Sequence, residues 1–196
     1  MKSRWRNMSR KRMAFVYGCL GVLITLRADD AAASLEFSAS VAELARWSSA
    51  VAVVTALETN SVWEGTRIVT FSRVHVDKLV AGRTATAEPV VKTLGGKVGT
   101  IGQIVGGEPE LAPGTRWMLF LRESPDGTSF VTARAQGQFL VTEDKTARWV
   151  LSPSPHLGHL LDRRATSRPA VSELRGHSLE AAERAIQVAW GETHAP

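Results

Sequence analysis

The feature that most constrains the fold is a succession of short segments, rich in β-branched and aromatic residues, that turn signals separate between residues 50 and 151. Residues 50–57 are apolar on both faces, which is typical of a strand covered on both sides. Further strands are predicted at residues 67–80, 87–94, 116–122, 129–134, 136–142 and 147–151. No long helical pattern separates these segments, so we expect five to seven antiparallel strands in a sandwich or a small barrel.

Turn residues indicate how some of these strands connect. Residues 59–65 have turn composition and precede the long strand. Ser124-Pro-Asp-Gly127 predicts a hairpin turn, and residues 143–145 predict a second one. The long strand changes its apolar phase at Ser72 and Arg73. Either a β-bulge at this point causes the change, or both faces of the strand are partly buried.

A long glycine-rich loop follows the strand at residues 87–94. A loop of this length in a compact domain is usually functional or disordered, and glycine lets a backbone approach another surface closely. Nucleotide-binding motifs do not fit, because Lys97 is followed by Val98 where a phosphate-binding loop needs Ser or Thr. We predict a recognition loop that comprises Gly95, Gly96, Gly99, Gly102, Gly106 and Gly107, with Trp63 as an exposed contact residue.

The N-terminal residues 1–33 have the pattern of a secretory signal peptide. Six basic residues precede an apolar run of 14 residues from Met13 to Leu26, and small residues follow. This run is shorter than the roughly 20 residues that span a bilayer, so we expect cleavage after Ala33 and a secreted or periplasmic protein. Cys19, the only cysteine, would leave with the signal. The alternative is that Cys19 accepts a lipid, although Tyr17 is bulky for that motif.

The signal segment also carries the whole excess of positive charge. Residues 1–33 hold seven of the 24 Lys and Arg residues and two of the 19 Asp and Glu residues, so 17 of each sign remain in the mature chain. A neutral mature chain lacks the basic surface that nucleic-acid binding needs. We therefore expect no nucleic-acid partner, and membrane contact only transiently through the signal.

Helices are predicted at both ends of the strand region. Ser40 and Glu43 have capping-box spacing and begin a short helix at residues 40–48. Near the C-terminus, Ser178 precedes residues that share one helical face, namely Leu179, Ala182, Ile186, Ala189 and Trp190. This face must pack on the barrel or on a partner. The predicted organisation is a signal peptide (1–33), a β-barrel domain (34–152), a linker (153–168) and a helical tail (169–196).

The sequence provides no complete catalytic or metal-binding motif. His156 and His159 lie in a Pro- and Gly-containing segment with Asp162 as the nearest third ligand, which favours solvated histidines over a zinc site. The carboxylates Glu58 and Glu64, like Asp77, are spread singly along the chain. We therefore assign no catalytic, cofactor-binding or metal-binding residue, and we expect no cofactor.

The order of these segments over residues 40–142 resembles that in small secreted bacterial proteins and, more distantly, the OB barrel of the netrin and tissue-inhibitor-of-metalloproteinase type. The resemblance implies an OB-like barrel with a helix before it, and a bias toward binding. Those inhibitors act through an N-terminal cysteine, which the mature chain lacks, so their mechanism is not carried over. The matching residues are Ser49 to Val51, Thr70, Val74, Val76, Gly82, Gly95, Gly96, Gly99, Pro113, Gly114, Leu119 to Leu121, Ala135 to Gly137 and Phe139.

Two classes of function are compatible with the sequence. The first is a non-catalytic binding or inhibitory module that contacts a protein or an extracellular polymer through the glycine loop and the barrel rim. The second is an extracytoplasmic hydrolase with a site built from dispersed residues. The lack of a recognisable nucleophile–base motif favours the binding module.

Overall fold

The computed structural model describes residues 35–161 and 168–195, which belong to one compact unit. The predicted signal peptide (1–33), its cleavage site after Ala33, Cys19 and Asp162 lie outside the described residues. Within these residues, no helix has the length and apolar character needed to cross a bilayer.

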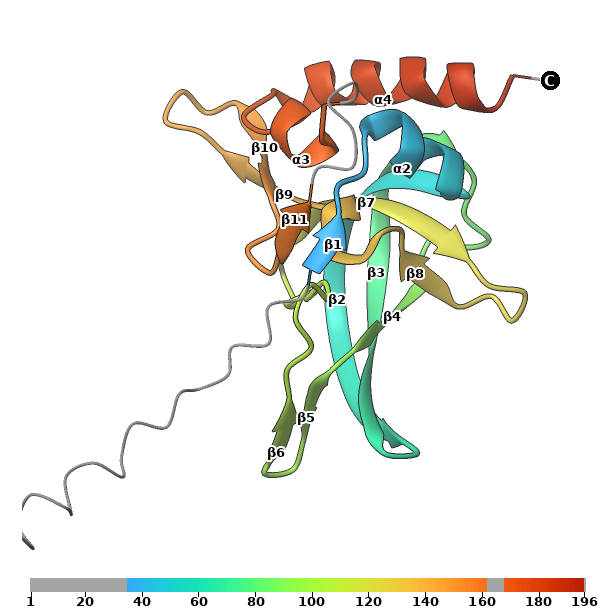
Figure 1. Cartoon of the computed structure of the whole chain (residues 1–196), viewed down its shortest axis with the longest axis vertical. Coiled ribbons are helices and arrows are strands. Elements are labelled where there is room, and N and C mark those ends of the chain that lie inside the picture. The colour runs from blue at the N-terminus through green and yellow to red at the C-terminus, as the bar shows by residue number, and fades with distance from the viewer. Residues whose placement is uncertain (1–34, 162–167, 196) are drawn as a thin grey trace, which may run out of the picture. The chain divides into compact units, whose positions relative to one another are not determined.

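A long hairpin of two strands dominates the fold. β2 (Ala50–Glu64) pairs antiparallel with β3 (Arg67–Gly82) along its whole length (Figure 1). The turn predicted at residues 59–65 is wrong, because the strand continues to Glu64 and the chain reverses at Gly65, whose φ is 61°. Pairing across the hairpin, such as that of Trp63 with Ile68, overrides the local turn composition.

Three further strands close this hairpin into a barrel: β4 (Val90–Leu94), β7 (Arg116–Glu123) and β8 (Ser129–Val131). β4 pairs with β3, β7 pairs with β2, and β8 pairs with both β4 and β7. The five strands therefore form a closed ring in the order β7-β2-β3-β4-β8, and only the β4–β8 pairing is parallel. The prediction of a small OB-like barrel is confirmed, and the sandwich is excluded.

Two more strands widen the sheet beyond β7. β9 (Gln138–Glu143) pairs with β7, and β10 (Trp149–Pro153) pairs with β9. The two predicted hairpins, β7–β8 and β9–β10, are confirmed. A short 3-10 helix, η1 (Arg134–Gly137), connects β8 to β9.

The change of apolar phase on β3 comes from burial of both faces and not from a bulge in this strand. The register shift near Ser72 and Arg73 lies between Ala56 and Glu58 of β2, so the extra residue belongs to the opposite strand and the bulge predicted in β3 is wrong. Ile68 and Val69 are both fully buried, and neighbouring residues of a strand point to opposite faces. Both faces of β3 are thus covered where the strand begins.

β7 connects two hydrophobic cores. Leu119 points into the barrel, whereas Phe120 points to the opposite face, where it packs under the helices. The barrel core consists of Ala50, Ala52, Val54, Ala56, Val74, Val91, Leu111, Trp117, Leu119, Leu121 and Val131.

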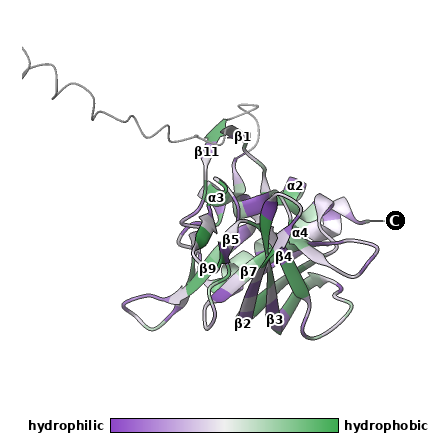
Figure 2. Cartoon of the chain, turned by 90° about the horizontal axis from the view of Figure 1, so that it is seen from below, coloured by the Kyte–Doolittle hydropathy of each residue, from purple (hydrophilic) through white to green (hydrophobic). Residues whose placement is uncertain are grey.

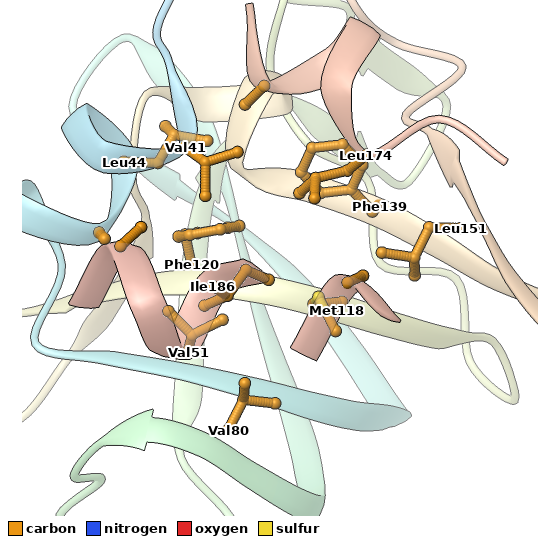
Figure 3. Close-up of a cluster of buried hydrophobic side chains, with 14 of the residues drawn as sticks. Val41, Leu44, Val51, Val80, Met118, Phe120, Phe139, Leu151, Leu174 and Ile186 are labelled. Atoms are coloured by element: carbon orange, nitrogen blue, oxygen red, sulfur yellow. The ribbon is translucent and has the colours of Figure 1, made fainter. Parts of the chain in front are cut away.

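Helices cover the second core. α2 (Val41–Trp47) begins with the predicted capping box, and α3 (Ala170–Glu173) and α4 (Leu179–Thr193) follow the strand region. Figure 3 shows Phe120 between side chains of α2 and Ile186 of α4. The C-terminal helix therefore buries its apolar face on the barrel unit, which resolves the question that the sequence left open.

Two short strands were not predicted. β1 (Leu35–Phe37) and β11 (His159–Leu161) pair in parallel, and β11 lies within the segment predicted as a linker. Pairing of β11 with β1 brings the start of the unit beside residues more than a hundred positions later in the chain.

Candidate functional site

The glycine-rich loop is itself a short hairpin. β5 (Gly96–Val98) pairs antiparallel with β6 (Ile101–Gln103), and Gly99 supports the turn with φ of 61°. A Cβ atom on Gly99 would meet nothing within 4 Å, so the tip is open. The β5–β6 hairpin contacts β2 and β3 and lies at the end of the barrel away from α4 (Figure 1).

The base of this hairpin is packed against the barrel. The Gly95 amide donates to the Ile68 carbonyl at 2.8 Å, and the Gly95 carbonyl accepts from Thr70 Oγ1 at 2.7 Å. Gly96 has φ of 127°, and a Cβ atom there would overlap Thr70 Oγ1 and Ser61 Oγ. Glycine is required at the base because hydroxyl groups of β2 and β3 occupy the space of a side chain.

The return segment of the loop is anchored as well. The Gly106 carbonyl accepts from Arg134 Nη2 at 2.8 Å, and the Gly107 carbonyl accepts from the Ala135 amide at 2.9 Å. Gly102, in contrast, is exposed, and its nearest neighbour for a Cβ atom would be 3.9 Å away. The six predicted glycines thus divide into an open tip (Gly99 and Gly102) and an anchored base (the other four).

A pocket opens at this end of the barrel, which we call the mouth pocket. Its volume is about 470 Å³, and the β5–β6 hairpin and residues 104–113 form one side of it. Its wall on the barrel strands is formed by the hydroxyl side chains of Thr59, Ser61, Thr70, Ser72 and Thr93. The apolar barrel core therefore gives way to a polar surface toward this opening.

Ser72 is the most deeply buried of these hydroxyl residues. Its exposed fraction is 1%, and no described residue forms a hydrogen bond with its Oγ atom. Most buried polar side-chain atoms in proteins have a hydrogen-bond partner, and one without a partner calls for an explanation. By contrast, Ser61 Oγ and Thr70 Oγ1 lie 2.8 Å apart and bond to each other.

The charged groups around the mouth pocket are largely paired. Glu108 accepts from the Leu94 amide at 3.0 Å and from Arg134 Nε at 2.6 Å. Glu110 lies 3.2 Å from His156 Nε2. Lys97 is exposed on β5, and no ion pair within the described residues involves it. Lys97 is thus an exposed cation near the rim.

Apolar side chains are exposed on the two neighbouring hairpins. Trp63 on β2 is 47% exposed, Ile101 beside the glycine turn is 54% exposed, and Ile104, directly after β6, is 98% exposed. Trp63 lies two residues beyond Ser61, on the same strand face, and Ser61 Oγ accepts from the Lys97 amide of β5 at 3.4 Å. Figure 2 looks onto this end and shows hydrophobic and hydrophilic residues close together on β2 and β3.

The other candidate residues lie apart from the pocket or are paired. His159 begins β11, whereas His156 lines the mouth pocket. Within residues 35–161 and 168–195, no group of three or more His, Cys, Asp or Glu side chains is placed to hold a metal ion.

Each of the dispersed carboxylates pairs with a cation. Glu64 lies 2.7 Å from Lys92 Nζ, and Asp77 lies 3.2 Å from Arg116 Nε. Glu58 accepts a hydrogen bond from Arg73, and this bond lowers the pKa of the Glu58 carboxyl. These three carboxylates thus have structural partners and do not converge with one another.

Comparison with models of protein families, with curated proteins and with solved structures finds no match for this chain. The resemblance to the netrin and inhibitor type therefore stays a prediction, apart from the barrel itself.

The spacing of hydroxyl residues in the sequence is a signal for the mouth pocket that the prediction of a recognition loop does not include. Thr59 and Ser61, like Thr70 and Ser72, are hydroxyl residues at alternate positions on paired strands. Such spacing places them on one face, but only the strand register shows that this face points into the barrel.

Proposed function

We propose that this chain is an extracytoplasmic, non-catalytic binding module that contacts a protein partner with the tips of its two hairpins. The observation that supports this most is the exposure of Trp63, Ile101 and Ile104 at the end of the barrel where the mouth pocket opens. Exposed apolar side chains grouped at one end of a domain are typical of interaction sites, and tryptophan is enriched at the centres of protein interfaces.

The charges at these tips favour a partner with an acidic rim. Arg67 and Lys97 are exposed, and neither belongs to an ion pair within the described part of the chain. Glu64, the nearby acidic residue, is already bound to Lys92. Apolar side chains bordered by cations suit a protein surface that has an apolar centre and an acidic rim. The two cations would steer such a partner toward the hairpin tips.

The extracytoplasmic location in this proposal rests on the signal-like residues 1–33. An inhibitory role is one form that such binding could take, since a module that covers a partner's functional surface blocks it. An extended extracellular polymer is the other class of partner that the sequence allows, and it is an outcome of the test below.

The alternative of a hydrolase requires a nucleophile hydrogen-bonded to a base. Ser72, the most buried hydroxyl of the mouth pocket, forms no hydrogen bond with His156 or any other described residue. This geometry favours recognition over nucleophilic attack.

The test is capture with residues 34–196 as immobilised bait from the extracytoplasmic fraction of the source cells. We expect a protein that the wild type retains and the double variant Trp63→Ser/Ile101→Ser loses. The matched control is Val188→Ser, which removes an apolar side chain of 62% exposure on α4 at the other end of the unit. A partner retained equally by all three baits, or a polymer retained in place of a protein, would contradict the proposal.

A further inference from the structure

The hydroxyl residues of the mouth pocket form one continuous patch. Thr59 pairs with Ser72 and Ser61 pairs with Thr70 across β2 and β3, and Thr70 also pairs with Thr93 across β3 and β4. Directly paired residues have Cβ atoms roughly 4.5–5.5 Å apart. The inner wall of the pocket is therefore a sheet surface of closely spaced hydroxyl groups from three strands.

The patch has unused hydrogen-bonding capacity at its buried end. Ser72 is 1% exposed and has no hydrogen-bond partner among the described residues, although it lines a pocket of about 470 Å³. A pocket of this size lies in the range of roughly 300–1,000 Å³ that is typical of small-molecule sites. It is many times larger than the roughly 30 Å³ that one water occupies in the liquid.

The chemistry of the lining restricts the ligand. Each hydroxyl can both donate and accept a hydrogen bond, so the patch suits groups that do the same. The buried part of the lining offers no free charge, because Glu108 is bound to the Leu94 amide and to Arg134, whereas Glu110 and Lys97 are exposed. An ionic ligand would lose its hydration there without gaining an opposite charge.

We propose that the mouth pocket binds a small, uncharged ligand that carries several hydroxyl groups, of the saccharide class, with Ser72 Oγ hydrogen-bonded to it at the buried end. The pocket shares Ile104 and Lys97 with the proposed protein-contacting surface, but neither Trp63 nor Ile101 lines it. Ligand binding in the pocket can therefore be tested apart from the proposed function through variants of Trp63 and Ile101.

The experiment titrates residues 34–196 with glucose, N-acetylglucosamine and maltose, and follows backbone amide shifts by NMR. We expect at least one of these probes to shift the amides of Ser72, Thr93 and Gly95. We expect Ser72→Ala to raise Kd about tenfold, which is the usual effect of losing one buried hydrogen bond. Ser129→Ala is the matched control, since Ser129 is a buried serine of barrel strand β8 that does not line the mouth pocket.

A second variant guards against misfolding. Thr93→Val removes another hydroxyl of the patch with little change in volume, and its amide spectrum shows directly whether the barrel is intact. We expect Ser72→Ala to unfold at the same temperature as the wild type or a higher one, because its lost hydroxyl has no partner to leave behind.

Three results would overturn the inference. The first is no shift of these amides with any of the three saccharides at about 50 mM, a concentration far above a Kd of about 1 mM, which is already weak binding. The second is binding that Ser72→Ala and Thr93→Val leave unchanged. The third is a site that, in parallel titrations with glucuronate and inorganic phosphate, binds one of these anions but no neutral saccharide. The double variant Trp63→Ser/Ile101→Ser should bind the saccharide as the wild type does. Failure of the proposed protein contact can therefore be distinguished from failure of this inference.

Discussion

Gly96 lies directly against Thr70, so closely that a Cβ atom on the glycine would overlap the threonine Oγ1 atom. The same Oγ1 atom donates to the Gly95 carbonyl and bonds to Ser61 Oγ. This contact holds the β5–β6 hairpin over the barrel opening and makes the base of the glycine-rich loop a structural element.

Gly96→Ala should therefore destabilise the fold. The φ of 127° disfavours any side chain, and the overlap adds to this cost, so we expect a loss of about 1–3 kcal/mol. Gly99→Ala, at the open tip, should cost about 1 kcal/mol, from its positive φ alone. Urea unfolding of both variants measures the difference, and equal losses would show that the hindrance at Gly96 is relieved by movement of the hairpin.

Leu119→Ala should strongly lower stability. Leu119 is fully buried in the barrel core, and truncation of a buried leucine typically costs about 2–5 kcal/mol. Leu79, which is 45% exposed on β3, provides the control variant Leu79→Ala, for which we expect a change within about 0.5 kcal/mol. The denaturation midpoints of the two variants measure this difference. Equal midpoints for Leu119→Ala and Leu79→Ala would place Leu119 outside the core.

Ile186→Ala should also destabilise the unit, by about 2–5 kcal/mol, although Ile186 lies in the C-terminal helix. Its side chain is fully buried in the same core as Phe120 and Leu44. Val188→Ser, two residues further on the exposed face of α4, should have little effect. A thermal unfolding midpoint that Ile186→Ala leaves unchanged would mean that α4 is dispensable for the barrel.

We expect stability to be independent of divalent metal ions. The sequence predicts no complete ligand set, and a structural metal would contribute folding free energy that a chelator removes. The measurement is the Tm of residues 34–196 with and without EDTA. A Tm that drops by many degrees with EDTA and recovers with zinc would overturn this expectation.

Protein recovered from outside the cytoplasm should begin at Ser34. Ala31 and Ala33 have the small side chains that signal peptidase requires, and the apolar run before them is short for a membrane span. Intact-mass spectrometry tests this directly. Recovery of the chain only in membranes, with Met1 retained, would reject cleavage and favour a retained or lipidated anchor.

Local patterns determined the elements of this protein well. The Ser40–Glu43 capping box and the two β7–β8 and β9–β10 hairpins were all predicted from residues a few positions apart. These features depend on interactions within one turn or hairpin, which short sequence windows contain. The turn that composition predicts at residues 59–65 is wrong because pairing with β3 outweighs the local preference of these residues.

The site depended on longer-range geometry. Strand register places Thr59 and Thr70 on the same wall as Thr93. A register shift of one residue would turn these side chains to the other face of the sheet. The packing of α4 on the barrel depends on residues far apart in the chain, because Ile186 shares one core with Phe120 and with Leu44, which stands more than a hundred positions earlier. The sequence pattern gives the hydrophobic period of each strand and helix. Which of their faces pack against one another is decided only in the tertiary structure, when the strands close into a ring and every apolar face must be buried.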